Sequence, residues 1–372
     1  MKKILALILA LVMSLSLVAC GGGNDAPAED EGEGDTAVAT DLKVGVFYYN
    51  FADAYITTVR AAMNAELEKL GLKEGQGFQN FDAQTNQATQ TDQVNTAITD
   101  GYNLLIVNVV ENGSPDAAQN IADAAKNAGI PVIFFNRDFD ASVIQSYENS
   151  AFVGTDPAEA GHMQGEAIGQ YLVENFDTVD LNGDGKISYV MFKGQEANPE
   201  AEMRTQYGVE DADKVLTEAG KAALEFYDAS NTKKYLVDQT GAWSAQAATD
   251  YMNTILGEYN DGNSNMIELV IANNDNMAEG AISALQSVGY NVEGGDKMIP
   301  VYGVDALASA VEKIDAGIMT GTVKQDGEAM AATIATLVQN VIDGAELMAN
   351  TDSYNVDADS AKIRVPYAMY TK

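Results

Sequence analysis

Short apolar runs alternate with amphipathic stretches of helical length from residue 41 to the C-terminus. The apolar runs lie at residues 43–49, 103–110, 131–135, 186–192, 267–272 and 299–304. The amphipathic stretches lie at 53–70, 116–129 and 199–220, and further ones begin after Trp243, at Asn276 and at Leu307. This alternation is typical of βαβ units, which build parallel sheets covered by helices. Because it runs through both halves of the chain, it predicts an α/β protein with two similar lobes.

Polar residues stand just past several of these apolar runs, namely Asp53, Asn136, Asn274, Asp275 and Asp305. In open parallel sheets, ligands bind outside the carboxyl ends of the strands, so we expect the chemistry of this protein at these positions. Asp and Asn also cap helices, and for any single position that interpretation stays open. Their recurrence at four strand ends favours a shared cleft.

The residue types at these strand ends suit a sugar. A carboxylate or carboxamide offers two polar atoms to neighbouring hydroxyl groups, while an arginine donates from the other side. The apolar C–H faces of a sugar need flat aromatic partners, and Tyr55 and Trp243 are the candidates. Trp243 is the only tryptophan, and a core position is the alternative. It follows the polar run 235–241 and opens a helix, which favours a loop at the mouth of the cleft over a buried face.

Residues 180–188, DLNGDGKIS, match the first part of an EF-hand calcium loop. They place side-chain oxygens at loop positions 1, 3 and 5 and glycine at position 6. The twelfth position, where a bidentate glutamate is expected, is Met191. Two interpretations stay open: a calcium site completed by a distant residue, or an acidic turn without an ion. A bound ion would be structural, because the loop offers no nucleophile beside an open coordination position.

The first twenty residues have the pattern of an export signal that ends in a lipid-attachment cysteine. Lys2 and Lys3 precede an apolar run, and Cys20 is the only cysteine of the chain. We therefore predict a lipoprotein signal peptide at 1–20 with Cys20 lipidated, followed by a disordered, acidic, Gly-rich tether at 21–40. A buried free cysteine is the alternative, but it does not explain the apolar leader. The cysteine content excludes disulfides and thiolate metal sites in the remaining chain.

Length and charge narrow the class further. A chain of 372 residues exceeds what one hydrophobic core usually organises, which predicts two domains. The formal net charge of −34 repels phosphate backbones and anionic lipid surfaces, so nucleic acid is excluded as a partner. The lone histidine, His162, lies in a predicted helix and is interpreted as a surface or packing residue rather than a catalytic base.

Several segments together resemble the galactose/glucose-binding proteins of the type I periplasmic binding protein superfamily. They are KVGVFYYNFADAY, PVIFFNRD, FVGTD, DLNGDGKI, NPEAEMRT, AWSAQA, ELVIANNDNMA, IPVYGVDAL and IRVPY, in the order of the family and spread over residues 43–367. The resemblance implies two Rossmann-like lobes with parallel sheets, joined by a hinge of three crossings near Gly154, Asp326 and Pro366. The implied N-terminal lobe comprises 41–154 plus 326–365, and the C-terminal lobe comprises 155–325 plus 366–372.

The same resemblance implies the ligands of two sites. The sugar ligands of the family fall on Asp53, Asn136, Arg204, Asn274 and Asp305, and its stacking residues fall on Tyr55 and Trp243. The family's calcium ligands fall on Asp180, Asn182, Asp184, Lys186 through its carbonyl, Ser188 and the distant carboxylate of Glu268. A structural Ca²⁺ is therefore the one cofactor that we expect.

This chain departs from the family pattern at four positions in the two sites. Asn198 and Glu200 stand where the family has a histidine and an aspartate, and Gln325 stands for an asparagine. The last two side chains are longer by one methylene, which displaces their polar atoms within the site and leaves the identity of the sugar open. Ser188 is shorter than the glutamine of the family, so its calcium contact is expected to pass through a water.

The expected function is that of a monomeric extracytoplasmic protein that binds D-galactose or D-glucose and delivers it to the permease and ATPase of an ABC importer. Lipidation would anchor it to the outer face of the cytoplasmic membrane. Another monosaccharide, such as ribose, xylose or a methyl galactoside, and a role as a sugar sensor coupled to a chemoreceptor are the alternatives. A glycoside hydrolase would need two carboxylates with separated pKa values, and a lobed repressor would need a DNA-binding segment; the sequence indicates neither.

Overall fold

The computed structural model describes residues 41–372. The predicted signal peptide, the lipidation of Cys20 and the tether therefore lie outside the described residues. Residues 39–372 form one compact unit. None of the helices in the described part is long and apolar enough to cross a membrane.

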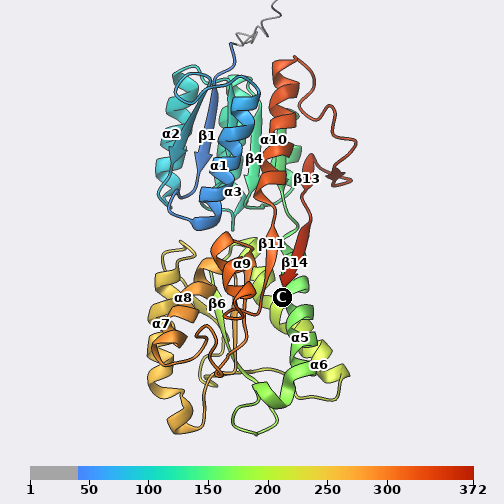
Figure 1. The fold of residues 1–372 in the computed structure, drawn as a ribbon. Coiled ribbons are helices and arrows are strands. Elements are labelled where there is room, and N and C mark those ends of the chain that lie inside the picture. The colour runs from blue at the N-terminus through green and yellow to red at the C-terminus, as the bar shows by residue number, and fades with distance from the viewer. Residues whose placement is uncertain (1–40) are drawn as a thin grey trace, which may run out of the picture. The chain divides into compact units, whose positions relative to one another are not determined.

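Seven strands form the first sheet, which we call sheet A (Figure 1). They are β1 (Val44–Tyr48), β2 (Phe78–Asp82), β3 (Leu104–Val107), β4 (Val132–Asn136), β5 (Ser150–Gly154), β12 (Asn355–Val356) and β13 (Lys362–Arg364). Their order is β12-β13-β5-β4-β3-β1-β2, and every pair of neighbours is parallel except β12 and β13.

A second sheet of seven strands, sheet B, repeats this arrangement. Its strands are β6 (Ser188–Lys193), β7 (Glu225–Phe226), β8 (Leu236–Val237), β9 (Leu269–Ala272), β10 (Val301–Asp305), β11 (Gly321–Gln325) and β14 (Tyr367–Thr371). The order is β14-β11-β10-β9-β6-β7, with β8 paired to β6 and only β14 antiparallel to its neighbour. The series β2-β1-β3-β4-β5 of sheet A thus recurs as β7-β6-β9-β10-β11 in sheet B, and the predicted α/β class with two similar halves is confirmed.

Helices cover both faces of each sheet, which is why most of the parallel strands are buried along their whole length. Those packed on sheet A are α1 (Ala54–Lys69), α2 (Gln87–Thr99), α3 (Pro115–Ala128), α4 (Ser142–Gln145) and α10 (Gly327–Ile342). Those packed on sheet B are α5 (Pro157–Val179), α6 (Pro199–Glu218), α7 (Ala245–Glu258), α8 (Asp275–Ser287) and α9 (Ala308–Asp315), and a 3-10 turn spans Asp261–Asn263. Figure 1 shows α10 beside α1, although they lie far apart in sequence.

The chain passes between the two sheets three times, after β5, after β11 and after β13. We call the part built on sheet A the N-terminal lobe and the part built on sheet B the C-terminal lobe. The boundaries given for the lobes above stay a prediction, because the contacts join residues 39–372 in a single unit.

A row of glycines on α5 sets the position of α6, which carries several candidate site residues. A Cβ atom added at Gly161 would lie 2.5 Å from the carbonyl oxygen of Met203, and one at Gly165 would lie 2.4 Å from that of Tyr207. The two helices therefore pack backbone to backbone. Overpacking at such a position costs about 1–3 kcal/mol, so these glycines fix the distance of α6 from sheet B.

Candidate functional site

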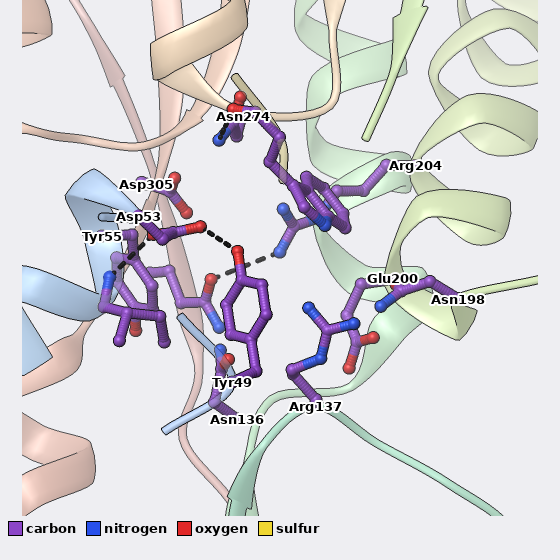
Figure 2. A pocket seen from close by; sticks show the side chains of 13 residues that line it. Tyr49, Asp53, Tyr55, Asn136, Arg137, Asn198, Glu200, Arg204, Asn274 and Asp305 are labelled. Carbon is purple, nitrogen blue, oxygen red and sulfur yellow. Dashed lines mark hydrogen bonds between the residues drawn. The ribbon is translucent and has the colours of Figure 1, made fainter. Parts of the chain in front are cut away.

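The ten residues predicted as sugar ligands all line one cavity. They come from both lobes, from the carboxyl ends of the strands and from the segments that follow them: Asp53, Tyr55, Asn136, Asn198, Glu200, Arg204, Trp243, Asn274, Asp305 and Gln325. Figure 2 labels all of these except Trp243 and Gln325. Three further residues complete the lining, Tyr49, Ile56 and Arg137. The structure thus brings the predicted residues together, while their contact with a sugar stays a prediction.

At three of these positions the residue both caps a helix and lines the cavity. Asp53 caps α1, because its Oδ1 accepts the N–H of Ile56 at 2.8 Å. Asn198 caps α6 and Asn274 caps α8 in the same way. Each cap uses one oxygen, and the other polar atom of the same side chain bonds a further group at the cavity: the Asn198 amide donates to Asn112, and the Asn274 amide donates to the carbonyl of Trp243. In Asp53 that atom is Oδ2, which accepts the hydroxyl proton of Tyr49.

Unusual backbone conformations gather at the cavity. Asn136 has a φ of 64°, Trp243 of 56° and Asp305 of 124°. A left-handed backbone is costly for a non-glycine residue, on the order of 1–3 kcal/mol, and persists only where the surroundings enforce it. At β4 the turn at Asn136 presents both this residue and Arg137 to the cavity. The strain therefore serves to aim polar side chains inward.

Trp243 lies in the loop before α7, as expected, but it is only 6% exposed, so the expectation that it avoids a buried face is wrong. The ring packs against Gly194 at the end of β6, where an added Cβ would lie only 2.0 Å from the indole. The lack of a side chain at Gly194 thus makes room for the indole. Among the described residues, the indole Nε1 and the hydroxyl of Tyr55 are buried without a hydrogen-bond partner. A ligand that accepts and donates hydrogen bonds would satisfy them.

Two guanidinium groups face the carboxylates of the cavity. Arg204 donates to Gln325 Oε1 at 3.3 Å and to the hydroxyl of Tyr367 at 2.9 Å. Arg137 lies over the ring of Tyr49, with 4.2 Å between its Cζ atom and the ring centroid. In the described chain, the Nε atoms of both arginines are buried without a partner. The site therefore offers donors in a fixed geometry.

Burial governs the charges of the cavity. Burial raises the pKa of Asp53, even though the Tyr49 hydroxyl and the N–H of Ile56 oppose this. Burial also raises the pKa of Asp305 well above its usual range, against the opposing effect of Arg204. Burial lowers the pKa of Arg137. Arg204 differs: burial lowers its pKa, but Tyr367 and Asp305 together raise that pKa above its usual value. Because the charged forms of Asp53, Asp305 and Arg137 are disfavoured, the cavity suits a neutral, hydroxyl-rich ligand better than an ion.

Asp275, which also follows β9, does not reach the cavity. Its carboxylate is fully buried and accepts the N–H of Leu307 at 2.8 Å and the hydroxyl proton of Thr322 at 2.6 Å. These bonds connect the start of α8 to Leu307, just before α9, and to Thr322 of β11.

Sequence reasoning missed Tyr49 and Arg137. Both were detectable by position, because Tyr49 directly follows β1 and Arg137 directly follows Asn136 at the end of β4. An aromatic residue after an apolar run reads as a continuation of the strand, and the strained turn at Asn136 is not visible in the sequence.

The acidic loop 180–188 connects α5 to β6, and the structure brings Glu268 to it. Glu268 Oε1 accepts the N–H of Leu181 at 2.7 Å, and its Oε2 accepts the N–H of Ser188 at 2.8 Å. Asn182, Asp184, Lys186, Ser188 and Glu268 line one pocket. Their oxygen atoms are of the type that calcium binds, but Asp180 does not line this pocket and accepts the N–H groups of Gly183 and Gly185 instead. Within residues 41–372, however, no group of three or more His, Cys, Asp or Glu side chains lies close enough to hold a metal, so the calcium site stays a prediction.

His162 lies on α5, as predicted, and away from the cavity. Its Nδ1 is 2.6 Å from Asp211 Oδ2, and its ring stacks on Tyr207 with centroids 3.9 Å apart. It is a packing residue between α5 and α6.

The sequence of residues 44–346 matches a family model described as a periplasmic binding protein domain. The chain belongs to this family. As a periplasmic binding protein it is a solute-binding protein and not an enzyme, which excludes a glycoside hydrolase built on Asp53 and Asp305. The predicted membership of the superfamily is thereby confirmed.

The relatives of this periplasmic binding protein are named after different sugars. The D-galactose/methyl-galactoside binding periplasmic protein MglB of Haemophilus influenzae is 33% identical over 341 residues, which are 92% of this chain and 93% of that protein. The D-xylose-binding periplasmic protein of Escherichia coli is 26% identical over 73% of this chain and 71% of its own. The ribose import binding protein RbsB of Bacillus subtilis is 23% identical over 93% and 95%.

Solved structures share the fold. An ABC transporter solute binding protein from Clostridium phytofermentans, with bound β-D-glucose, superposes with a TM-score of 0.67 at 19% identity and covers 88% of this chain and 94% of its own. Another from Bacillus halodurans, with bound myo-inositol, gives 0.66 at 24% identity over 89% and 95%. Both confirm the type I periplasmic binding protein fold that was predicted.

Proposed function

We propose that this protein is the sugar-binding component of an ABC importer and that it captures D-galactose or D-glucose in the cavity between its lobes. The observation that carries the proposal is the convergence of all ten predicted ligands on one cavity. The similarity to the galactose/methyl-galactoside binding protein of Haemophilus influenzae supports the choice of hexose.

The proposed binding mode follows from the chemistry of the lining. Asp53 and Asp305 accept hydrogen bonds from sugar hydroxyls, and Arg204 donates to them. The carboxamides of Asn136, Asn274 and Gln325 engage adjacent hydroxyls in both directions. The rings of Tyr55 and Trp243 cover the apolar C–H faces. Closing of the lobes over the sugar then presents a loaded form to the permease and its ATPase.

The alternative ligand is a different monosaccharide, bound in place of galactose or glucose. The names of relatives include xylose and ribose, and Asn198, Glu200 and Gln325 differ from the pattern of galactose-binding proteins. A sugar sensor that signals through a chemoreceptor would use the same cavity and the same closure, and a transport defect after deletion of the gene would separate the two roles.

We also propose a structural Ca²⁺ in the loop 180–188. The side-chain oxygens of Asp180, Asn182, Asp184, Ser188 and Glu268 and the carbonyl of Lys186 would hold it. This is supported by the position of Glu268, which supplies the carboxylate that Met191 does not. When bound, the ion would cross-link the loop to the start of β9.

We further propose that the protein acts outside the cytoplasm, anchored through a lipid on Cys20. The periplasmic names of its relatives support the location. Incorporation of labelled palmitate that disappears in Cys20→Ala would establish the anchor, and labelling of that variant would refute it.

Replacement of Trp243 tests the proposed site. Trp243→Ala should abolish measurable binding of D-galactose and D-glucose by calorimetry, because it removes the stacking surface. Trp243→Phe is the matched control and should retain most of the affinity, since it keeps a flat ring. Unchanged affinity in the alanine variant would contradict the site.

A further inference from the structure

The loop between β3 and α3 touches the opposite lobe outside the cavity. A Cβ atom added at Gly113 would lie 2.4 Å from the carbonyl oxygen and 2.8 Å from the Cβ of Ala197. Gly113 has no left-handed backbone, so its own conformation permits a side chain. Only the neighbour from the C-terminal lobe excludes one. Two backbones from different lobes therefore meet at this glycine.

Hydrogen bonds between the lobes surround this close approach. Glu200 Oε1 accepts the backbone N–H of Asp138 at 2.6 Å, and its Oε2 accepts Asn112 Nδ2 at 3.1 Å. In the opposite direction, Asn198 Nδ2 donates to Asn112 Oδ1 at 2.9 Å. These residues are between 1% and 6% exposed, so the bonds are shielded from water.

The N-terminal side of this contact is held by bonds within its own lobe. Lys362 donates to Asp138 Oδ1 at 2.5 Å and Arg364 to its Oδ2 at 2.7 Å, both from β13. The carbonyl oxygen of Asp138 accepts a second proton of the Asn112 amide at 2.8 Å. Little conformational freedom is lost when Glu200 docks, because its partners already hold their positions.

We infer that Asn112, Gly113 and Asp138 of the N-terminal lobe, together with Ala197, Asn198 and Glu200 of the C-terminal lobe, form a closure contact. This contact holds the closed form through direct bonds between protein groups. It gives Asn198 and Glu200 a role in closure. Both carboxylate oxygens of Glu200 accept hydrogen bonds from the opposite lobe, and the amide of Asn198 donates one to that lobe. The longer side chain of Glu200 spans the gap between the lobes.

The contact predicts a slow release of the ligand, and only this consequence rests on the proposed sugar-binding function. Asn112 and Gly113 do not line the cavity, so their replacement removes none of the proposed sugar ligands. They therefore separate closure from ligand contact, which a replacement of Glu200 alone does not.

Gly113→Ala in the chain from residue 21 onward is the test, with Gly257→Ala as the matched control. Gly257 lies on α7, has no left-handed backbone and has open space where a Cβ would stand. Small-angle X-ray scattering should give a larger radius of gyration for Gly113→Ala than for the wild type at saturating D-galactose or D-glucose, because closure over the sugar brings the two backbones together. The control should match the wild type. Equal radii in all three proteins would overturn the contact.

The second readout is the dissociation rate of D-galactose and D-glucose, followed by the fluorescence of Trp243, the only tryptophan. Asn112→Ala removes two bonds between the lobes and should speed dissociation by about 5- to 100-fold, at a similar association rate. The preference between the two sugars should not change. An unchanged dissociation rate, or a changed preference, would refute the role in closure.

The two proposals fail in different ways. If neither sugar changes the fluorescence of the wild type, the proposed choice of hexose fails, and the same scattering comparison at saturating ribose or xylose then decides the closure contact. If the sugars bind but Gly113→Ala and Asn112→Ala behave like the wild type in both readouts, the contact fails and the proposed function stands.

Discussion

A single added methyl group at Gly194 should displace the proposed stacking surface. The Cβ of Gly194→Ala would lie 2.0, 2.1 and 2.5 Å from three ring atoms of Trp243. Ordinary contact begins near 3.4 Å, so the indole has to retreat by about 1.4 Å or the end of β6 has to move. The backbone of Trp243 is held in place, because its carbonyl oxygen accepts Asn274 Nδ2 at 3.3 Å and Asn276 Nδ2 at 3.2 Å.

The size of the effect follows from overpacking. An extra methylene in a close-packed site costs about 1–3 kcal/mol. If the cost falls on the bound form, the affinity for D-galactose or D-glucose drops by about 5- to 150-fold, since 1.4 kcal/mol is a factor of about ten. Titration calorimetry measures this loss directly.

The control for this experiment is again Gly257→Ala, which adds the same atoms in open space. We expect wild-type affinity for it and a melting temperature equal to or slightly above that of the wild type, because Gly is a poor helix former. Wild-type affinity together with a wild-type melting temperature in Gly194→Ala would show that Trp243 is not held against this glycine, and the proposed geometry would be wrong.

Two further predictions concern the loop 180–188 and Asp275. Removal of Ca²⁺ with a chelator should lower the melting temperature and leave sugar affinity nearly unchanged, because the loop contributes no residue to the cavity lining; an equal melting temperature would count against the ion. Burial raises the pKa of Asp275 from its ordinary 3.8 to about 7. The unfolded chain therefore releases this proton first, and stability should fall as the pH rises from about 4 to about 7. Asp275→Asn should flatten this slope in urea unfolding, and parallel slopes for both proteins would exclude Asp275 as its source.

The main architecture was accessible from the sequence because burial leaves a periodic trace. A strand covered on both faces, such as β4 or β9, reads as a continuous apolar run, and the polar residue after it marks the carboxyl end. All carboxyl ends of a parallel sheet lie at one edge, so Asp53 and Asn136 could be assigned to one edge of sheet A, and Asn274 and Asp305 to one edge of sheet B, without knowledge of strand order.

Strands with weaker apolar patterns were not predicted. The strand β2 carries Gln79 and Asn80, and β11 carries Thr322 and Lys324, so neither gives a continuous apolar run. Their positions in the sheets result from pairing with the buried strands β1 and β10. Tertiary pairing of this kind overrides local propensity.

The contacts that span the lobes lay furthest from prediction. The bond between Asn112 and Glu200 joins residues that are 88 positions apart in the chain. A glycine such as Gly113 reads as an ordinary loop residue until Ala197 is placed against it. The relative position of two lobes depends on many such nonlocal terms, and no local pattern encodes them.

The central claim is the capture of a hexose in the cavity, and a thermal-shift panel on the chain from residue 21 onward tests it most directly. The panel comprises galactose, glucose, ribose, xylose, arabinose and a methyl galactoside, each at millimolar concentration, where a tight ligand stabilises by several kcal/mol. We predict a large rise in the melting temperature with galactose or glucose and with no other sugar of the panel. A large shift with a pentose instead would contradict the hexose assignment, and no shift with any of the six would contradict the proposed class of ligand.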